Sequence, residues 1–408
     1  MTFRLLSLQS VFKAMTENSK INFEDTATAF AHKSNAQLKK SHLVFSTMNY
    51  PTMVKTGTAL TSVALKLHLP IKGLIKSTLF DQFCGGESIA GSEPRMRKLA
   101  ERGVKTILDY SVEGEASEQG YDDAVEEALR VSDYAKEHVS IPFCVIKPTG
   151  IGSSKLMEKK QSGENLTEEE QKRLDRIFER LDTIVGNVVK NGMRFMVDAE
   201  ESWYQDVVDR MVYDLMLKYN KEKPYVYTTY QLYRHQALPN MIKGYEEVTA
   251  AGCYFGAKLV RGAYMEKERE RAEEKGYQDP IQPNKEATDR DYNKALEFVA
   301  EHVDKFAVCV GTHNEESSQL MVDLMDKYGI PKTHENIFFA QLLGMSDNIS
   351  FKVADLGYNV AKYVPYGPVE KVLPYLFRRA AENTSIAGQS GREFRLIKKE
   401  LERRKANK

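Results

Sequence analysis

The sequence contains little cysteine, a single tryptophan and no excess of charge of either sign. Lysine plus arginine and aspartate plus glutamate each number 58, so the formal net charge is zero, whereas nucleic-acid-binding proteins usually carry a basic domain or stripe. The eight histidines show neither the HxH nor the HExxH spacing of metal ligands. No stretch reaches the ~18 uninterrupted apolar residues of a membrane span. The composition therefore argues against a nucleic-acid-binding protein, a metal site and an integral membrane protein.

The four cysteines are far apart in the chain: Cys84, Cys144, Cys253 and Cys309. Cys144 and Cys309 lie inside apolar segments that read as strands. This usage favours buried free thiols in a reducing compartment over disulfides or a zinc site. The first 20 residues are mildly basic and amphipathic, lack the apolar core of a signal peptide and match a transit peptide only weakly.

Eight short apolar segments alternate with helical patterns from Gly103 to about Asn383. Continuous apolar runs that alternate with helices are typical of parallel strands buried on both faces. Eight such units close a (βα)8 barrel, whose active site lies at the carboxyl ends of its strands. The predicted strands are Val104–Leu108, Ile141–Ile146, Met193–Val197, Tyr225–Thr229, Ala257–Val260, Phe306–Val310, Ile337–Ala340 and Val360–Tyr363. We therefore predict an α/β fold, a distorted (βα)8 TIM-type barrel at 101–390, with an added N-terminal helical region at 1–100 and a C-terminal basic helix or tail at 391–408.

The segment after the second strand shows how specific the helical signals are. Thr167 followed by Glu170 forms a capping box, apolar residues follow at three- and four-residue spacing, and Gly192 ends the helix. The polar, glycine-containing stretch Gly150–Asn165 before it is expected to be a mobile excursion. The last residues include the amphipathic run Phe394–Arg404, for which a packing helix is favoured over a membrane-surface or lid helix.

An arginine pair follows the eighth strand in YLFRRAAEN, at Arg378 and Arg379. Adjacent helical residues point about 100° apart, so the two guanidinium groups can grip one anion from two sides. Tyr375 lies one turn before the pair and Glu382 one turn after it. Paired arginines mostly lie on solvated surfaces, but the place directly after a barrel strand favours carboxylate binding.

Two further strand ends carry polar residues and glycine. KLVRGAY ends the fifth strand and carries cations at Lys258 and Arg261. Directly after them, Gly262 and Ala263 would let a flat or phosphorylated ligand approach the backbone. GTHN ends the sixth strand with three hydrogen-bonding side chains, which favours ligand contact. The acids of DAEES end the third strand and are interpreted mainly as charge partners. GIGSSK lacks the third glycine of a Rossmann motif and the Gly-Lys-Ser/Thr ending of a phosphate loop, so neither mode of nucleotide binding is expected.

The segments KLVRGAY, GTHN, DAEES, QLLGMSD, YVPYGP and YLFRRAAEN, in this order and spacing, resemble the proline dehydrogenase family over roughly residues 76–390. The resemblance implies a distorted (βα)8 barrel that binds FAD without a Rossmann motif. It implies oxidation of L-proline to Δ1-pyrroline-5-carboxylate by hydride transfer to FAD, with electrons passed to a quinone, as the first step of proline catabolism to glutamate. The expected partners are L-proline, a quinone acceptor and a peripheral membrane surface, with no nucleic acid and no metal. The expected location is the cytoplasm, with peripheral contact at the inner membrane, or the mitochondrion if the source is eukaryotic.

The resemblance also implies roles for particular residues. Arg378 and Arg379 match the pair that binds the proline carboxylate, assisted by a lysine for which Lys76 is chosen over Lys72. Asp109 matches the acid that orders the site, and Lys258 stands beside the flavin N5. The implied wall of the substrate pocket consists of Tyr264, Leu342, Tyr363 and Tyr375. The implied FAD contacts are Tyr110, Gln231, Val260, Arg261, Gly262, Ala263, Thr312, His313, Asn314 and Glu382.

The sequence departs from the family pattern at two positions. Lys258 stands where many members have arginine, and Met265 where some have tryptophan. Tyr363 favours proline over hydroxyproline, because the related hydroxyproline enzymes tend to carry a smaller residue there. The residues alone leave two alternatives open, a Schiff-base aldolase or similar lyase that uses Lys147 or Lys258, and a non-catalytic barrel.

Overall fold

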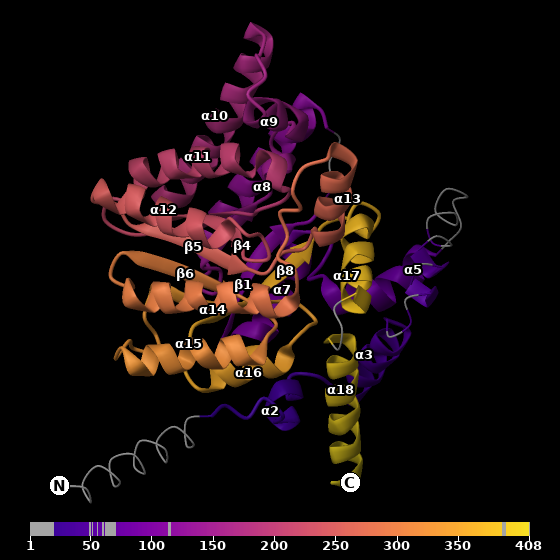
Figure 1. Ribbon diagram of the computed structural model, residues 1–408. Coiled ribbons are helices and arrows are strands. Elements are labelled where there is room, and N and C mark those ends of the chain that lie inside the picture. The colour runs from indigo at the N-terminus through magenta and orange to yellow at the C-terminus, as the bar shows by residue number, and fades with distance from the viewer. Residues whose placement is uncertain are drawn as a thin grey trace, which may run out of the picture.

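In the computed structural model the chain forms a closed barrel of eight parallel strands surrounded by helices (Figure 1). The structure describes residues 20–48, 50, 52–54, 56–58, 61, 71–112, 116–385 and 389–407. The strands follow one another around the barrel in chain order. They are β1 (Val104–Tyr110), β2 (Phe143–Ile146), β3 (Arg194–Val197), β4 (Val226–Gln231), β5 (Phe255–Val260), β6 (Phe306–Gly311), β7 (Ile337–Leu342) and β8 (Val360–Tyr366). The predicted (βα)8 barrel is confirmed. Residues 1–19, which the sequence suggested to be amphipathic, lie outside the described part of the chain.

Most observed strands run further toward their carboxyl ends than the sequence pattern predicts. β8 ends at Tyr366 instead of Tyr363, because β1 continues to pair with it as far as the register Tyr110↔Tyr366. β4 likewise ends at Gln231 instead of Thr229, paired with Val260 of β5. Most of these extra residues are polar, aromatic or proline, so an apolar pattern stops too early. They form the end of the barrel where a TIM-type active site lies.

The helices cover the outside of the barrel, and extra helices close one side of it (Figure 1). Those that follow the barrel strands are α8 (Glu118–Lys136), α9 (Ser154–Gln161), α10 (Glu168–Lys190), α11 (Ser202–Tyr219), α12 (Ala237–Ala250), α13 (Met265–Lys275), α14 (Lys285–Glu301), α15 (Glu315–Lys327), α16 (Asp347–Asp355) and α17 (Leu373–Ser385). Before β1 lie α2 (Thr26–Phe30), α3 (Asn35–Met48), α5 (Lys72–Ile75), η1 (Lys76–Phe80), α6 (Asp81–Phe83) and α7 (Ile89–Ala100). The described part of the predicted N-terminal region is therefore helical, and α18 (Gln389–Ala406) ends the fold.

Side chains alternate between the barrel interior and the helical layer. Ile107, Met196, Tyr227 and Cys309 belong to a small apolar cluster inside the barrel, whereas their strand neighbours pack against the helices. Successive residues of a strand face opposite sides of the sheet, so each strand supplies both cores. The four cysteines are all buried and free, as predicted.

The segment between β2 and α10 differs from the expected mobile excursion. The predicted capping box is present, since Thr167 accepts from the Glu170 amide and Glu170 accepts from the Thr167 amide. Ahead of it, however, residues 154–161 form α9, with Leu156 and Met157 buried against the core. Leu156 and Met157 are the buried residues of α9, and two apolar positions are too few to predict a helix from the sequence.

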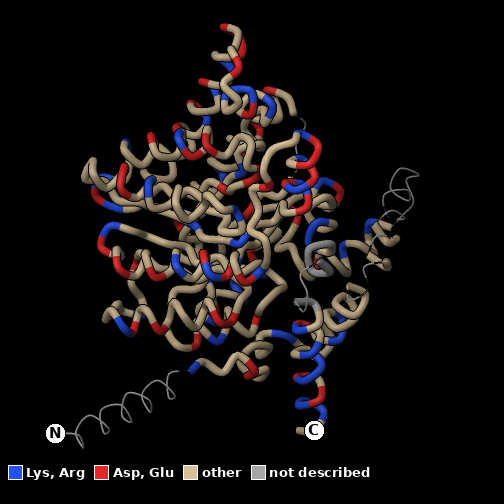
Figure 2. The backbone as a smooth tube through the Cα atoms, viewed as in Figure 1, with Lys and Arg blue, Asp and Glu red and all other residues tan. Residues whose placement is uncertain are grey.

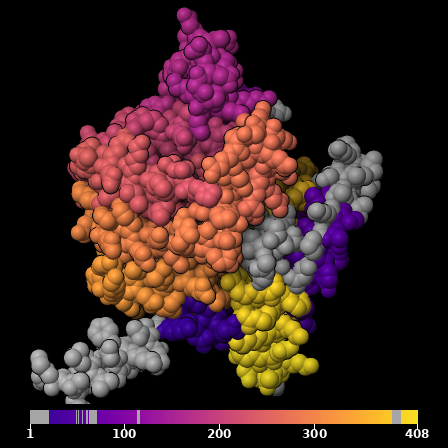
Figure 3. Space-filling view, in the orientation of Figure 1, coloured from indigo at the N-terminus to yellow at the C-terminus, as the bar shows by residue number. Residues whose placement is uncertain are grey.

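The C-terminal helix α18 packs against α2 and α3, so the two ends of the described chain lie side by side (Figures 1 and 3). Leu396 and Ile397 are fully buried in a cluster that includes Phe30 and Phe45. The helix is rich in basic residues (Figure 2). Arg395 and Lys399 pair with Glu24, and Arg403 and Arg404 pair with the buried Glu400. The packing-helix interpretation of Phe394–Arg404 is confirmed.

A buried carboxyl group on α11 gives the fold a predictable pH dependence. Asp209 accepts hydrogen bonds at Oδ1 from Gln205 and Thr228, and burial raises its pKa to about 6. The unfolded chain binds this proton only below about pH 3.9, so the cost of ionising Asp209 appears as the pH rises through this interval. We expect Asp209→Asn to stabilise the protein by up to about 3 kcal/mol at pH 8 and by almost nothing at pH 4. Chemical denaturation at both pH values measures this, and the exposed neighbour Asp206→Asn should show no such difference.

Candidate active site

A cavity of about 590 Å³ opens at the carboxyl ends of the strands. All eight strands or the loops directly after them contribute to its wall, as expected for the active end of a TIM-type barrel. From β1 to β8 these residues include Asp109, Lys147, Asp198, Gln231, Lys258, Gly311, Gln341 and Tyr363. Helices α17 and α18 add Tyr375, Arg378, Arg379 and Arg392. The cavity therefore has a size and polarity suited to an organic ligand.

Two lysines and two aspartates form an ion-pair group in the cavity wall. Lys147 Nζ lies 2.8 Å from Asp109 Oδ1 and 3.9 Å from Asp198 Oδ2, and Lys258 pairs with Asp198 Oδ1. Burial opposes ionisation of Asp109, but Lys147 outweighs it and holds the pKa of this carboxyl below its usual value. Burial likewise opposes the charge of Lys147, while Asp109 and Asp198 raise its pKa above the usual value. Asp109 and Lys147 therefore form a charged pair at neutral pH.

Lys258 connects this group to the tyrosine at the end of β8. Its ammonium group donates to the Tyr363 hydroxyl at 2.9 Å and lies 4.7 Å from the centre of the Tyr363 ring. Burial raises the pKa of Tyr363 well above its usual value, so the hydroxyl is neutral. Lys258 and Tyr363, which are 105 residues apart in the sequence, thus form one polar floor of the cavity.

The fifth and sixth strand ends lie side by side, as their predicted shared role requires. Arg261 pairs with Asp289 at 2.7 Å and donates to Thr312 Oγ1 at 2.7 Å and Ser317 Oγ at 3.0 Å. Gly262 has φ +135°, and a Cβ there would lie 2.5 Å from the Tyr233 ring. Both the backbone conformation and the close approach therefore require glycine at this position. The resulting surface of backbone and small side chains continues through Ala263, which also lines the cavity.

His313 is held from the C-terminal helix. Its Nδ1 lies 3.0 Å from Ser346 Oγ, and Arg392 of α18 donates to both the His313 carbonyl and Ser346 Oγ at 3.0 Å. The Ser346 amide donates to Glu393 at 2.7 Å, and Ser346 has φ +48°, a conformation that non-glycine residues rarely adopt. Burial and then the nearby cations, Lys362 first, hold the pKa of His313 well below its usual value. His313 is therefore neutral, and α18 fixes its position.

Helix α17 places the arginine pair at the cavity. Arg378 and Arg379 both line it, and the Arg379 guanidinium lies 5.5 Å from the centre of the Tyr375 ring. Tyr264, after β5, lines the same cavity, and burial raises the pKa of its hydroxyl while the charge of Arg378 lowers it. Leu342 and Tyr363 complete the predicted apolar and aromatic wall. Cations beside apolar walls are the groups that bind a small amino or imino acid.

Most of the predicted site residues are brought together, and two are not. Lys76 is half exposed and pairs with Glu87, and it does not line the cavity; the competing choice Lys72 pairs with Glu370. Tyr110 packs against Tyr366, with ring centres 5.4 Å apart, outside the cavity lining. The side chain of Glu382 lies outside the described part of the structure.

Sequence reasoning assigned other roles to two residues that line the cavity. Lys147, a Schiff-base candidate in one alternative, lines the cavity directly after β2 and pairs with Asp109, whereas the lysine chosen from the N-terminal region does not line it. The position of Lys147 directly after a predicted strand was the sequence signal that could have assigned it to the site. Arg392 lies in the stretch assigned to a separate C-terminal tail, and nothing in its local sequence distinguishes it from the other basic residues there.

The fold and the cavity define a class: a (βα)8 barrel with a polar cavity at the carboxyl ends of its strands, lined by an arginine pair and by Gly262. The family model of proline dehydrogenase matches residues 92–392. The chain belongs to the proline dehydrogenase family, and the predicted enzyme class, an oxidoreductase acting on L-proline, is confirmed by this membership.

Individual relatives agree with the family match. The chain is 32% identical to "Proline dehydrogenase 1, mitochondrial" of Dictyostelium discoideum over 434 residues, covering 95% of this chain and 76% of that protein. It is 44% identical to the human protein of the same name over 241 residues, covering 58% and 40%. A crystal structure of proline utilization A from Bdellovibrio bacteriovorus shares the fold with a TM-score of 0.69 at 20% identity, covering 90% of this chain and 37% of that one.

Two findings bear on other site types. No cluster of three or more histidine, cysteine, aspartate or glutamate side chains suited to a metal ion occurs in the part of the chain that the structure describes. Among the same residues, none of the helices is both long enough and apolar enough to cross a membrane.

The contacts of Arg392 yield a prediction for the cavity. Arg392→Ala would remove the hydrogen bonds to the His313 carbonyl and to Ser346 Oγ and the ion pair with Glu315, so His313 should lose its fixed position. Hydrogen bonds to charged groups contribute about 1.5–3 kcal/mol each, and part of this is expected to appear as a roughly tenfold weaker flavin affinity. Flavin fluorescence on dilution measures this. Arg395→Ala on the outer side of the same helix is the matched control, and equal flavin affinity in both variants would contradict the assigned role.

Proposed function

We propose that this chain oxidises L-proline to Δ1-pyrroline-5-carboxylate, with FAD as the hydride acceptor and a quinone as the next acceptor. The observation that carries the proposal is the meeting of the arginine pair of α17, the Lys258–Tyr363 floor and the glycine-edged strand ends in one cavity. This reaction needs one side of the cavity to bind the substrate carboxylate. It needs the other side to be flat and rich in hydrogen-bond donors for the cofactor.

The described residues fit a flavin. Gln231 Oε1 is buried and has no hydrogen-bond partner among the described residues, so it offers an acceptor to a ligand N–H group. Gly262 and Ala263 leave room for a flat ring against the backbone. Arg261, Thr312, His313 and Asn314 would hold the remaining polar parts of FAD. When bound, FAD supplies the two-electron acceptor that no amino-acid side chain provides.

The substrate would be held by its carboxylate. Arg378 and Arg379 would bind this group from two sides, and Lys147 stands in the wall where the predicted assisting lysine is needed. Tyr264, Leu342, Tyr363 and Tyr375 would enclose the pyrrolidine ring and exclude water. Orientation of C5 is then the main contribution of the protein, since positioning alone supplies a large part of the rate enhancement.

Proton transfer places few demands on the site. Oxidation removes a hydride from C5 and a proton from the nitrogen of neutral proline, which gives the C=N bond. A substrate amine bound in its neutral form needs no strong general base. Asp109 and Asp198 are already paired with lysines and would orient the polar groups around the substrate. Their charges balance those of Lys147 and Lys258.

The proposed location is a membrane surface of the cytoplasm, or of the mitochondrion in a eukaryotic cell. Transfer to a quinone requires access to a membrane, and α18 offers no free apolar face for it because Leu396 and Ile397 are buried. The N-terminal helices offer a better candidate, since Leu43 and Leu74 are 60% and 65% exposed. Sedimentation with anionic lipid vesicles, compared between the wild type and a Leu43→Ser/Leu74→Ser variant, tests this contact.

Anaerobic reduction of the bound flavin is the decisive test of the proposed reaction. The purified protein should be yellow, and its visible flavin band should bleach on addition of L-proline. Hydroxyproline is tested alongside, and Tyr363 predicts a slower response to it. A yellow protein that proline does not bleach would contradict the proposed substrate, and a colourless protein that cannot be loaded with FAD would contradict the cofactor.

The lyase alternative finds less support in the same geometry. A Schiff-base lysine must be neutral to attack a carbonyl group. Lys147 is instead held charged between Asp109 and Asp198, and these carboxylates raise its pKa. Borohydride trapping with a carbonyl substrate would detect a lyase, and trapping at Lys147 would overturn this argument.

A further inference from the structure

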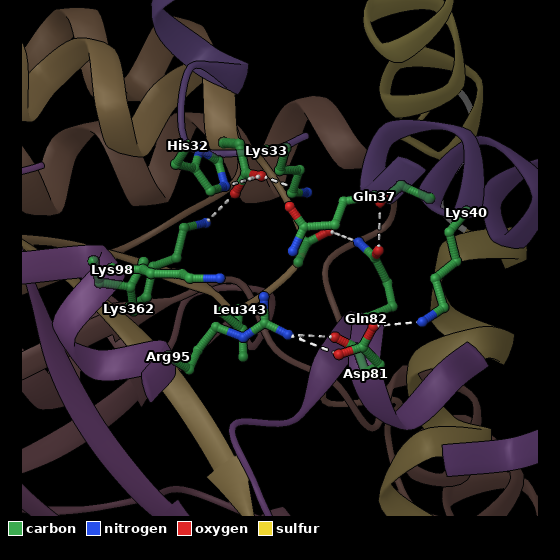
Figure 4. Close-up of a pocket in the computed structure, with 14 residues that line it drawn as sticks. His32, Lys33, Gln37, Lys40, Asp81, Gln82, Arg95, Lys98, Leu343 and Lys362 are labelled. Atoms are coloured by element: carbon green, nitrogen blue, oxygen red, sulfur yellow. Dashed lines mark hydrogen bonds and ion pairs between the residues drawn. The ribbon is translucent and has the colours of Figure 1, made fainter. Parts of the chain in front are cut away.

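A second pocket lies outside the barrel, between the N-terminal helices and the β7–α16 loop (Figure 4). It has a volume of about 40 Å³, which holds about three waters or one small polyatomic ion. Its lining comes from α3, α6, α7, the loop after β7 and the outward side of β8. It is separate from the active-site cavity, because the two share no lining residue.

The lining is strongly biased toward positive charge. Five cationic side chains face two carboxylates, Asp81 and Asp347, which leaves an excess of three positive charges. The cationic residues are Lys33, Lys40, Arg95, Lys98 and Lys362. The whole chain, by contrast, has no net charge, so this excess is a local feature. Like charges gathered in one place repel one another, and a bound anion would offset this repulsion.

The two carboxylates are already shared between cations. Asp347 pairs with Lys33 at 2.8 Å and with Lys362 at 2.9 Å, and Lys362 is fully buried. Asp81 pairs with Lys40 at 2.6 Å and with Arg95 at 3.1 Å. Four of the five cations thus share these two carboxylates, and the fifth pairs with neither of them.

Lys98 is that fifth cation. It extends toward the centre of the pocket together with the Arg95 guanidinium, and no ion pair or hydrogen bond joins it to the residues drawn (Figure 4). Lys98 and Arg95 stand one turn apart on α7, so both reach the same space from one rigid element. A flexible, exposed lysine would normally turn away from a neighbouring guanidinium into solvent.

We propose that this pocket binds a phosphate dianion, either free or as the phosphoryl group of a small metabolite. Arg95 and Lys98 would contact its oxygens directly, and Lys40 and Lys33 would add charge from the N-terminal helices. A dianion fits the excess charge better than a carboxylate, which carries one negative charge. The bound anion would join α3 to α7 and so tie the N-terminal helices to the barrel.

Calorimetric titration of the full-length, flavin-loaded protein tests the site. At pH 8 and constant ionic strength set with chloride, inorganic phosphate should bind at one site, with a Kd of about 10 mM or tighter, and acetate at least tenfold more weakly. Glycerol phosphate is titrated in parallel. Tighter binding of the ester identifies a phosphorylated metabolite as the ligand, and tighter binding of inorganic phosphate identifies the free ion. No saturable heat from either would overturn the proposal.

Variants assign the binding to the pocket. Lys98→Gln, which breaks no ion pair in Figure 4, should weaken phosphate binding at least tenfold, and Arg95→Gln/Lys98→Gln should abolish it. Lys172→Gln/Lys243→Gln removes two surface charges from helices elsewhere and should bind as the wild type does. Equal affinity in wild type and Lys98→Gln would overturn the proposal. Flavin reduction by proline should be unchanged in Lys98→Gln, so failure here is distinguishable from failure of the proposed reaction.

Discussion

Replacing Arg379 by alanine should raise the KM for L-proline by at least 30-fold, with flavin content and fold unchanged. Truncating one partner of a buried, hydrogen-bonded charge pair costs about 2–5 kcal/mol, which is roughly 30- to several-thousand-fold in affinity. The substrate carboxylate would still enter the cavity but would lose one of its two guanidinium groups. Arg378→Ala should have an effect of the same order, because the two side chains hold the group from different sides.

Steady-state kinetics with L-proline and an artificial electron acceptor measure this effect. Arg379→Lys keeps the charge without the planar fork and should fall between the wild type and alanine. Arg102→Ala, an exposed arginine after α7, removes a charge far from the cavity and should leave KM unchanged. A wild-type KM in both Arg378→Ala and Arg379→Ala would remove the carboxylate clamp from the proposed function.

Replacing Lys258 by methionine should lower turnover by about 100-fold or more. The methionine fills a similar volume but leaves Asp198 with only the more distant Lys147, 3.9 Å away, and Tyr363 without its donor. Removing one partner of a buried pair costs about 3–5 kcal/mol. We expect part of this loss in kcat and part in thermal stability, because the pair also holds the ends of β3, β5 and β8 together.

Lys258→Arg separates the two roles of this residue. Arginine keeps the charge beside Asp198, and many members resembling this chain carry arginine here, so turnover should stay within about tenfold of the wild type. Lys105→Met is the matched control, since Lys105 lies near the amino end of β1, on a barrel strand but far from the cavity. Wild-type turnover in Lys258→Met would show that the Lys258–Tyr363 floor takes no part in catalysis.

The barrel and the position of its site were predictable from the sequence because both depend on local patterns. Strand and helix periods are set by residues that are close in the chain, and parallel strands place all their carboxyl ends on one side. For the same reason Asp109, Lys258, His313 and Tyr363 could be expected to share one cavity, and they do.

The sequence did not reveal which residues outside the strand–helix repeat of the barrel take part in the site. Lys76 is a lysine, as expected, but it pairs with Glu87 and does not line the cavity. Lys147, directly after β2, lines the cavity. Arg392 stands 79 residues after His313 and reaches its carbonyl because α18, packed on α2 and α3, begins beside the cavity.

The sequence by itself determined the fold, the end of the barrel that carries the site, and the arginine pair that faces it. The tertiary structure alone decided which lysine stands beside Asp109, how the C-terminal helix fixes His313, and that five cations meet around two acids outside the barrel. The physical reason is distance along the chain: periodicity constrains neighbours within a few turns, whereas contacts between distant segments depend on how whole elements pack.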